Sequence, residues 1–351
     1  MNKKFDFKDL LILDMANNHQ GDVEHGLNIV RSFAKVVKDR NARAALKFQF
    51  RQLDTFIHQD HQKNSDHKQV QRFLSTRLPW DKFQALLDEV RAQGMVTMCT
   101  PFDEASVDII CDMGFDVIKV ASCSGKDWPL LEKVADADKP VIFSTGGLTL
   151  RDIDNLVSFF QHRGVQFAIM HCVAIYPTPD ANMNLQQIAL LRNRYPGIHV
   201  GWSTHESPSD MTPVQLAVAL GAELFERHVG IARKDSPLNA YSSTPEQIAE
   251  WITSKQRAQV LCGSRERQPA SEAEQSAIDG LKRGVYAKRK IRKGAVIESD
   301  QVYFAIPYIE GQLDSGNFKA GIVSKSDVVA NKPIFGEKVD LPGSEDELVI
   351  K

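Results

Sequence analysis

The sequence predicts an α/β fold, a (β/α)8 or TIM barrel, followed by a small C-terminal domain. Short apolar runs recur eight times between residue 9 and about residue 262, and helical patterns separate them. Apolar runs that alternate with helices are typical of a parallel sheet covered on both faces. Eight such units fit a closed barrel. The runs lie at 10–16, 44–50, 95–100, 116–122, 140–146, 166–172, 199–203 and 222–228.

The segments between the runs carry helix-boundary signals. Residues 81–94, 103–114 and 150–164 have helical patterns, and the last two end in Gly114 and Gly164. Glycine is the expected residue just past a helix C-terminus. An open, doubly wound sheet is the alternative fold. No G-x-G-x-x-G fingerprint follows the first run, which disfavours that alternative.

Length and composition predict more than one domain. A chain of 351 residues suits a barrel with an appendage. We expect the barrel at 1–263, a polar linker at 264–280 and a second domain at 281–345. Alternation at 285–291 predicts short strands in the second domain. A domain of about 65 residues buries little core by itself, so we expect it to dock on a larger body.

Composition argues against several classes of function. The net charge is −2, so no basic surface for nucleic acid is expected. The apolar stretch before Asp14 is too short for a secretory signal or a membrane span. Five scattered cysteines form no C-x-x-C pair and indicate reduced thiols. We therefore expect a cytoplasmic protein that binds neither nucleic acid nor membrane.

Polar side chains gather where the runs end, which is where (β/α)8 enzymes place their active sites. Such groups can bind an anion, a metal or hydroxyls, and a structural protein has no reason to collect them on one rim. The polar residues are Asp14, Asn18, His19, Lys47, Gln49, Thr100, Lys119, Ser122, Ser144, Thr145, His171, Ser203, His205, Glu226 and His228, and Phe102 and Gly146 stand among them.

Two lysines, Lys47 and Lys119, would converge on the barrel mouth, where amine cations bind phosphate or carboxylate. For each of them, reaching from a strand end to solvent is an equal alternative. A Schiff-base role is a third reading, because a buried lysine loses its proton readily.

The fifth run ends in Ser144, Thr145 and Gly146, and Thr149 with Asp152 then forms a capping-box pattern for the next helix. Hydroxyls and exposed backbone N–H groups at a helix N-terminus suit a phosphate. An ordinary strand-to-helix turn is the alternative.

Two histidines, His205 and His228, close the seventh and eighth runs. These runs would be neighbouring strands, about 4.8 Å apart. Two imidazoles there could share a divalent cation, with Glu226 nearby, and leave positions open for water and substrate. A hydrogen-bonded pair of rim histidines is the alternative. His171 can equally be a core residue.

Seven short strings occur in order along these runs: Asn18-His19-Gln20-Gly21, Lys47-Phe48-Gln49, Thr100-Pro101-Phe102-Asp103, 118–122, Ser144-Thr145-Gly146, His171-Cys172 with 176–179, and Glu226-Arg227-His228. Together they resemble the N-acetylneuraminate (sialic acid) synthase family. Residues 290–294 resemble the antifreeze-like SAF domain of that family. The resemblance covers nearly the whole chain and implies a TIM barrel followed by a SAF domain.

The resemblance also implies an activity, the condensation of phosphoenolpyruvate with a sugar aldehyde such as N-acetylmannosamine to give a nonulosonic acid and phosphate. It implies catalytic roles for Asp14, His205 and His228, with a divalent cation (Mn2+ or Mg2+) on the two histidines. It implies a domain-swapped homodimer in which the SAF domain of one subunit covers the barrel mouth of the other. The substrate-binding residues that it implies are Lys47, Gln49, Thr100, Phe102, Lys119, Ser122, Ser144, Thr145, Gly146, Tyr176 and Ser203.

The chain departs from the family mainly at positions that serve the sugar. Asp14 replaces a glutamate, Leu238 replaces an aspartate, and Ile306 replaces an arginine of the SAF domain. A fourth departure is Thr204, where the family has aspartate. We therefore expect an acceptor other than N-acetylmannosamine, with a different or less polar substituent. Two rival functions are a class I aldolase with Lys119 as its imine lysine and a sugar-phosphate-binding protein without catalysis.

Overall fold

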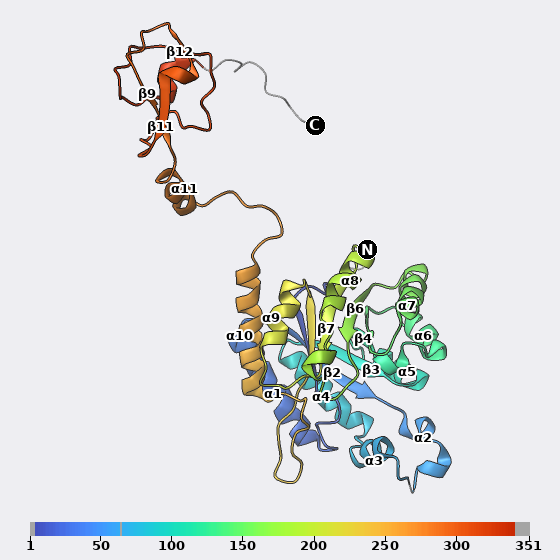
Figure 1. Cartoon of the computed structure of the whole chain (residues 1–351). Coiled ribbons are helices and arrows are strands. Elements are labelled where there is room, and N and C mark those ends of the chain that lie inside the picture. Colours follow the sequence, from blue (N-terminus) through green and yellow to red (C-terminus); the bar gives the residue numbers. More distant parts are fainter. Residues whose placement is uncertain (1–3, 64, 341–351) are drawn as a thin grey trace. The chain divides into compact units, whose positions relative to one another are not determined.

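The computed structural model describes residues 4–63 and 65–340, which form two compact units that divide after Gly263. In the first unit, eight parallel strands close into a barrel in the order β1 to β8, with helices around it (Figure 1). The predicted (β/α)8 fold is confirmed. Among the described residues, no helix is long and apolar enough to cross a membrane.

The elements of the barrel alternate as predicted, except that three helices, α2 to α4, lie between β2 and β3. The strands are β1 (Leu10–Asp14), β2 (Arg43–Phe50), β3 (Val96–Pro101), β4 (Val117–Val120), β5 (Val141–Ser144), β6 (Phe167–Cys172), β7 (His199–Thr204) and β8 (Leu224–His228). The α-helices are α1 (Val23–Asp39), α2 (Leu53–Phe56), α3 (Lys68–Ser75), α4 (Trp80–Ala92), α5 (Glu104–Asp112), α6 (Trp128–Ala135), α7 (Leu150–His162), α8 (Gln186–Arg194), α9 (Thr212–Ala219) and α10 (Pro245–Cys262).

The predicted helix boundaries agree with the structure. Gly114 and Gly164 follow α5 and α7 with φ of 74° and 68°, a left-handed conformation that favours glycine. Both hydrogen bonds of the predicted capping box between Thr149 and Asp152 are present at the start of α7. These local signals therefore fix where the helices begin and end.

Side chains alternate along each strand between the barrel interior and the surrounding helices. On β1, Leu10 and Ile12 belong to a small apolar cluster that fills the barrel, whereas Leu11 and Leu13 pack into the larger core shared with the helices. The inward rows become polar at the C-terminal ends of the strands. Polar residues that stand two positions after a member of the apolar cluster are Asp14, Lys47, Thr100, Lys119, Ser144, Cys172 and Glu226.

The strand register brings the polar ends of three neighbouring strands to one level. Asp14 on β1 is the ladder partner of both Lys47 on β2 and His228 on β8. Backbone hydrogen bonds between parallel strands hold this register. The three side chains therefore meet at one point on the rim without help from loops.

The second unit contains two small antiparallel sheets, β9 with β11 and β10-β12-β13, around an apolar core of its own. Its elements are α11 (Glu272–Asp279), β9 (Gly284–Ala287), β10 (Val296–Ile297), β11 (Val302–Ala305), β12 (Ile322–Ser324) and β13 (Val339–Asp340). The segment expected to be a polar linker contains a helix, α11. Ser271 caps the start of this helix by accepting a hydrogen bond from Glu274 N, which favours helix formation there. Residues 341–345 of the expected second domain lie outside the described residues.

A close contact between β7 and β8 yields a first prediction. A Cβ on Gly201 would lie 2.3 Å from the carbonyl oxygen of Leu224. We expect Gly201→Ala to lower the free energy of unfolding by about 1–3 kcal/mol, because strand backbone must shift. Urea unfolding followed by circular dichroism measures this change. Gly280→Ala is the control, since a Cβ there makes only ordinary contacts, at 3.6 Å and 3.7 Å from the nearest atoms, and its φ of −61° suits alanine. Equal losses in the two variants would contradict the steric argument.

Candidate active site

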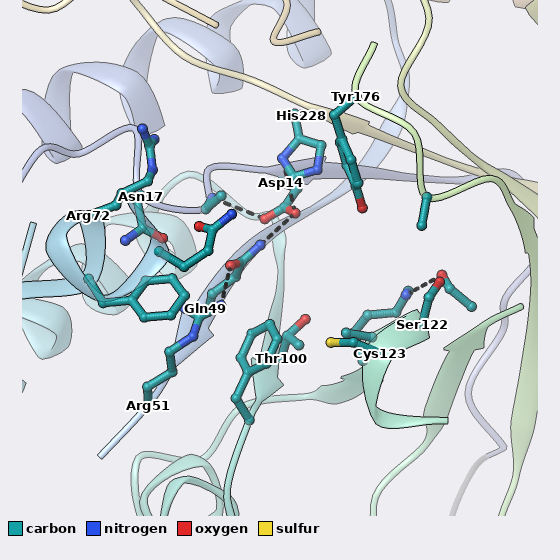
Figure 2. A pocket seen from close by; sticks show the side chains of 18 of the residues that line it. Asp14, Asn17, Gln49, Arg51, Arg72, Thr100, Ser122, Cys123, Tyr176 and His228 are labelled. Carbon is teal, nitrogen blue, oxygen red and sulfur yellow. Dashed lines mark hydrogen bonds and ion pairs between the residues drawn. The ribbon is translucent and has the colours of Figure 1, made fainter. Parts of the chain in front are cut away.

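A cavity of about 810 Å3 opens at the C-terminal ends of the barrel strands (Figure 2). It brings together predicted site residues from strands that are far apart in the sequence. The predicted residues that line it are Asp14, Asn18, Lys47, Gln49, Thr100, Phe102, Lys119, Ser122, Ser144, Tyr176, Ser203, His205, Glu226 and His228.

Two predicted substrate-binding residues, Thr145 and Gly146, are not part of the cavity lining. The Thr145 hydroxyl donates a hydrogen bond to the carbonyl of Met170 at 3.3 Å. The backbone N–H of Gly146 donates to Ser122 Oγ at 3.0 Å, and a Cβ at Gly146 would lie 2.8 Å from that oxygen. Gly146 therefore positions Ser122, which does line the cavity, whereas Thr145 ties the end of β5 to β6.

Four buried charges form an ion network made of Lys47, Asp14, Glu226 and Lys119. Lys47 Nζ lies 3.0 Å from Asp14 Oδ2 and donates a hydrogen bond to Glu226 Oε1. Lys119 Nζ lies 3.5 Å from Glu226 Oε2 and donates to Ser144 Oγ at 2.5 Å. Each buried charge therefore has a partner of opposite sign, which offsets the cost of removing it from water.

Burial and ion pairing shift the pKa values of the two lysines of the ion network in opposite directions. Burial opposes the charged form of Lys47, but Asp14 and Glu226 outweigh it and raise the pKa of Lys47. Burial dominates at Lys119 and lowers its pKa. Burial would raise the pKa of Glu226, but Lys119 and Lys47 outweigh that effect and hold this pKa well below its usual range. At neutral pH, Glu226 is thus a fixed carboxylate between two amines.

The two rim histidines face one another, with ring centres 5.3 Å apart. His205 Nδ1 donates to the carbonyl of Val173 at 3.0 Å, and His228 Nδ1 lies 3.3 Å from Asp14 Oδ2. Burial lowers the pKa of His228 and lowers that of His205 to about 3. Both rings are therefore neutral at pH 7, and a protonated Nδ1 leaves the Nε2 lone pair available. Metal-binding histidines commonly have this tautomer, with one ring N–H held by a backbone carbonyl or a carboxylate.

The described residues contain no group of three or more histidine, cysteine, aspartate or glutamate side chains arranged to hold a metal. The two facing imidazoles of His205 and His228 are therefore the side chains on the rim that we consider as metal ligands. A divalent cation bound by two protein ligands would complete its shell with water and substrate, as a catalytic site requires. The two neutral histidines fit such a role.

Two tyrosines border the histidines. The Tyr176 ring centre lies 4.1 Å from that of His205 and 5.1 Å from that of Tyr241. Tyr241 also packs edge-on against His228, with ring centres 5.2 Å apart. The rings limit the access of water to the imidazoles, which agrees with the lowered pKa of His205.

Some lining residues were not predicted from the sequence. Arg51 continues the inward row of β2 two residues after Gln49, so strand alternation could have revealed it. Asn17, Arg72 and Tyr241 lie on loops or on α3, and no periodic pattern marks them.

Several polar residues at the strand ends have structural roles instead. His171 is buried, and its Nε2 bonds to the carbonyl of Met183 at 2.8 Å, which favours the core alternative. His19 is buried against Phe83, and burial lowers its pKa to about 4.

Leu238 was expected to face the acceptor, but it is not part of the cavity lining. A Cβ on Gly230 would lie 2.6 Å from Leu238 Cδ2, so Leu238 packs against that backbone.

A second buried ion pair holds the segment that follows His205. Arg227 Nη1 donates to Glu206 Oε1 at 2.9 Å, and Nη2 donates to the carbonyl of Ser207 at 3.0 Å. Burial raises the pKa of Glu206 to about 7 despite the arginine. Arg227 lies between Glu226 and His228 and points to the other face of β8, so it supports the loop and not the cavity.

The ion network yields a second prediction. Glu226→Gln should lower the free energy of unfolding by about 3–5 kcal/mol at pH 7, because two buried lysines lose a carboxylate. The folded-state pKa of Glu226 is depressed, so this stabilisation is present above the unfolded pKa of about 4.3 and is lost as pH falls below it. Urea unfolding at pH 7 measures the first effect, and a series that continues from pH 5 down to about pH 2 measures the second. Glu89→Gln, at an exposed pair with Arg31, is the control and should cost at most about 1 kcal/mol. Similar losses in both variants would contradict the prediction.

Comparison with known proteins places this site in a family. Residues 36–267 match the model of the NeuB family. The chain is 30% identical to N-acetylneuraminate-9-phosphate synthase of Drosophila melanogaster, over 69% of this chain and 66% of that protein. It is 27% identical to N,N'-diacetyllegionaminic acid synthase of Campylobacter jejuni, over 82% and 87% of the two chains.

A solved structure extends the similarity to almost the whole chain. It is that of a Chromobacterium violaceum protein described as a candidate spore coat polysaccharide biosynthesis protein E. The two share 43% identity with a TM-score of 0.93, over 95% of this chain and 100% of that chain. The family model covers more than half of the chain. The resemblance seen in the sequence is thereby confirmed, and the chain belongs to the NeuB family.

Proposed function

We propose that the protein condenses phosphoenolpyruvate with a sugar aldehyde to give a nonulosonic acid and phosphate. The observation that carries the proposal is a single cavity that joins two buried lysines, several hydroxyl groups and two neutral imidazoles. Lysines and hydroxyls suit the anion, and the imidazoles suit a metal that binds an aldehyde. Two relatives in the family are named for the synthesis of such acids.

The phosphoenolpyruvate side of the proposal rests on Lys119 and its surroundings. Lys119 bonds to Ser144 Oγ, and Ser122 and Ser203 add hydroxyls to the same cavity. The hydroxyl of Thr100 is buried without a hydrogen-bond partner among the described residues, so it is free to bind a ligand. Cations and hydroxyls held in a buried site stabilise charge that develops on a reacting anion more than water does.

The acceptor side of the proposal rests on the rim histidines. A divalent cation, Mn2+ or Mg2+, would be held by His205 and His228, and when bound it supplies Lewis-acid polarisation of the aldehyde. Asp14 accepts hydrogen bonds from Gln49 Nε2 at 3.1 Å and from the backbone N–H of Ala16 at 3.0 Å. It thereby holds one carboxylate oxygen toward His228 and Lys47, which orients the imidazole.

The assembly and location of the protein remain predictions. A cytoplasmic homodimer, with a SAF-like domain of one subunit over the barrel of the other, would bring Ile306 to the acceptor. Exposed apolar side chains on the second unit, including Leu281, Ile306 and Val329, support the expectation that this unit docks.

The acceptor panel is the direct test of the proposal. The full-length protein, incubated with phosphoenolpyruvate, a divalent cation and a series of hexoses, deoxy sugars and N-acetylhexosamines, should release phosphate with at least one aldehyde. Mass spectrometry should then detect the sugar extended by a pyruvate unit. Reactions without an acceptor are the control. Binding of phosphoenolpyruvate without turnover on any aldehyde would contradict the proposal and favour the non-catalytic relative.

One observation keeps the class I aldolase as a second candidate. Burial lowers the pKa of Lys119, and an imine-forming lysine must be neutral. Borohydride reduction with a keto substrate would then trap an adduct on Lys119. An unmodified Lys119, together with a metal requirement, would favour the condensation.

A third prediction concerns the metal. His205→Ala and His228→Ala should each abolish turnover, because the metal would lose one of its two protein ligands. Each ring also packs against a tyrosine, so circular dichroism of each variant checks that the fold is retained. A chelator should abolish turnover of the unaltered protein, and added Mn2+ or Mg2+ should restore it. Exposed His162→Ala on α7 is the control. Full turnover after thorough removal of divalent cations would rule out the metal.

A fourth prediction concerns the anion. Lys119→Met should weaken phosphoenolpyruvate binding by about 1.5–3 kcal/mol, the contribution of a charge-assisted hydrogen bond. Titration calorimetry measures this without turnover. Lys133→Met, at an exposed pair with Asp108, is the control and should bind normally. An unchanged affinity in Lys119→Met would show that this amine does not contact phosphoenolpyruvate.

A further inference from the structure

Arg51 is a cation that aromatic rings hold at the edge of the cavity. It lies just after β2, two residues beyond Gln49. Its guanidinium carbon is 3.6 Å from the ring centre of Phe102 and 4.1 Å from that of Phe73. Stacking of this kind fixes the plane of a guanidinium and leaves the N–H groups at its edge available.

Within residues 4–63 and 65–340, no carboxylate pairs with Arg51. Its one side-chain hydrogen bond runs from Nη2 to Gln49 Oε1 at 3.2 Å, and its Nε is buried without an acceptor. The carboxylate of Asp103 accepts from the backbone N–H groups of Gln52 and Ser106 instead. Burial lowers the pKa of Arg51 to about 10, which still leaves a cation at neutral pH. A desolvated cation without a partner is costly, which indicates that its anion comes from outside the chain.

The remaining charges of the cavity do not supply that anion. The ion network is balanced, with two amines facing two carboxylates. Arg72 is an exposed residue on α3 that also lines the cavity, and no ion pair engages it among the described residues. Arg51 and Arg72 therefore give this part of the cavity a surplus of positive charge.

A second cavity, of about 450 Å3, adjoins the first at Arg51. Asn17, Gln49, Arg51 and Phe73 line both cavities. Figure 2 shows Asn17, Gln49, Arg51 and Arg72 on the side of the first cavity away from Ser122. The surplus charge thus lies apart from the hydroxyls assigned to phosphoenolpyruvate, with room for a substituent beyond it.

We propose that Arg51 binds a negatively charged substituent of the acceptor sugar, a phosphate ester or a carboxylate, with Arg72 as a second cation. The inference rests on the proposed condensation and names the class of its acceptor. A guanidinium offers two parallel N–H groups to the paired oxygens of either anion. This proposal replaces the expectation of a less polar substituent, which depended on Leu238 and Ile306. Of these two residues, Leu238 does not line the cavity.

Matched pairs of acceptors test the inference. Phosphate release from phosphoenolpyruvate is compared for N-acetylmannosamine and its 6-phosphate, and for mannose and mannuronate. The anionic member of at least one pair should have a kcat/KM roughly 10- to 100-fold higher, the range expected for a charge-assisted hydrogen bond. Added salt should reduce this preference, because part of it is electrostatic. Preference within the first pair identifies a phosphate ester, and preference within the second identifies a carboxylate.

Variants of Arg51 show whether this residue is responsible. Arg51→Gln should remove the preference by raising KM for the anionic acceptor, with KM for phosphoenolpyruvate unchanged. Arg51→Lys keeps the charge without the planar fork, so it should retain part of the preference. It also provides a test if Arg51→Gln does not fold. Arg31→Gln on α1 removes the same charge from an exposed pair with Glu89 and is the matched control.

Two results would overturn the inference: neutral acceptors that react as well as their anionic partners, or an Arg51→Gln defect in phosphoenolpyruvate affinity alone. If no acceptor supports turnover, the proposed condensation fails, but calorimetry can still show whether Arg51 binds an anionic sugar. The unaltered protein should then bind N-acetylmannosamine 6-phosphate or mannuronate roughly 10-fold or more tightly than Arg51→Gln does. Equal affinities would refute the role of Arg51.

Discussion

The site depends on the ion network of Lys47, Asp14, Glu226 and Lys119. Removing four charges from water is unfavourable, and the network tolerates it because each charge has an opposite partner. Asp14 and Lys47 meet because the register of β1 and β2 pairs them, and Glu226 on β8 and Lys119 on β4 reach the same point from the inward rows of their own strands. The same hydrogen bonds that close the sheet therefore hold the cations in place.

Neighbouring groups take their orientation from the network. Asp14 directs His228 through Nδ1, and Lys119 directs the hydroxyl of Ser144. Because these side chains are buried, their positions are set before any ligand arrives. A site in which charges and dipoles are already oriented pays little reorganisation when charge develops in a reaction. The apolar cluster beneath them excludes water from the other end of the barrel.

Arg51 differs from the network in the way it is held. The network compensates each charge within the chain, whereas Arg51 lies over two aromatic rings and pairs with no carboxylate among the residues that the structure describes. The two lysines share their counter-ions, so a ligand must compete with Glu226 for them. Arg51 has no such competitor. The cavity thus combines a balanced region with a region of surplus positive charge.

The sequence by itself determined the barrel, the ends of its helices and the strand-end part of the cavity lining, because alternation and capping act over a few residues. It also placed Lys47, Lys119 and the rim histidines at strand ends. Only the tertiary structure decided that Lys47 contacts Glu226, 179 residues away in the chain, and that Arg51 lies between Phe73 and Phe102. It likewise removed Thr145, Gly146 and Leu238 from the lining. These outcomes depend on sheet register and loop packing between distant segments, which leave no periodic pattern in the sequence.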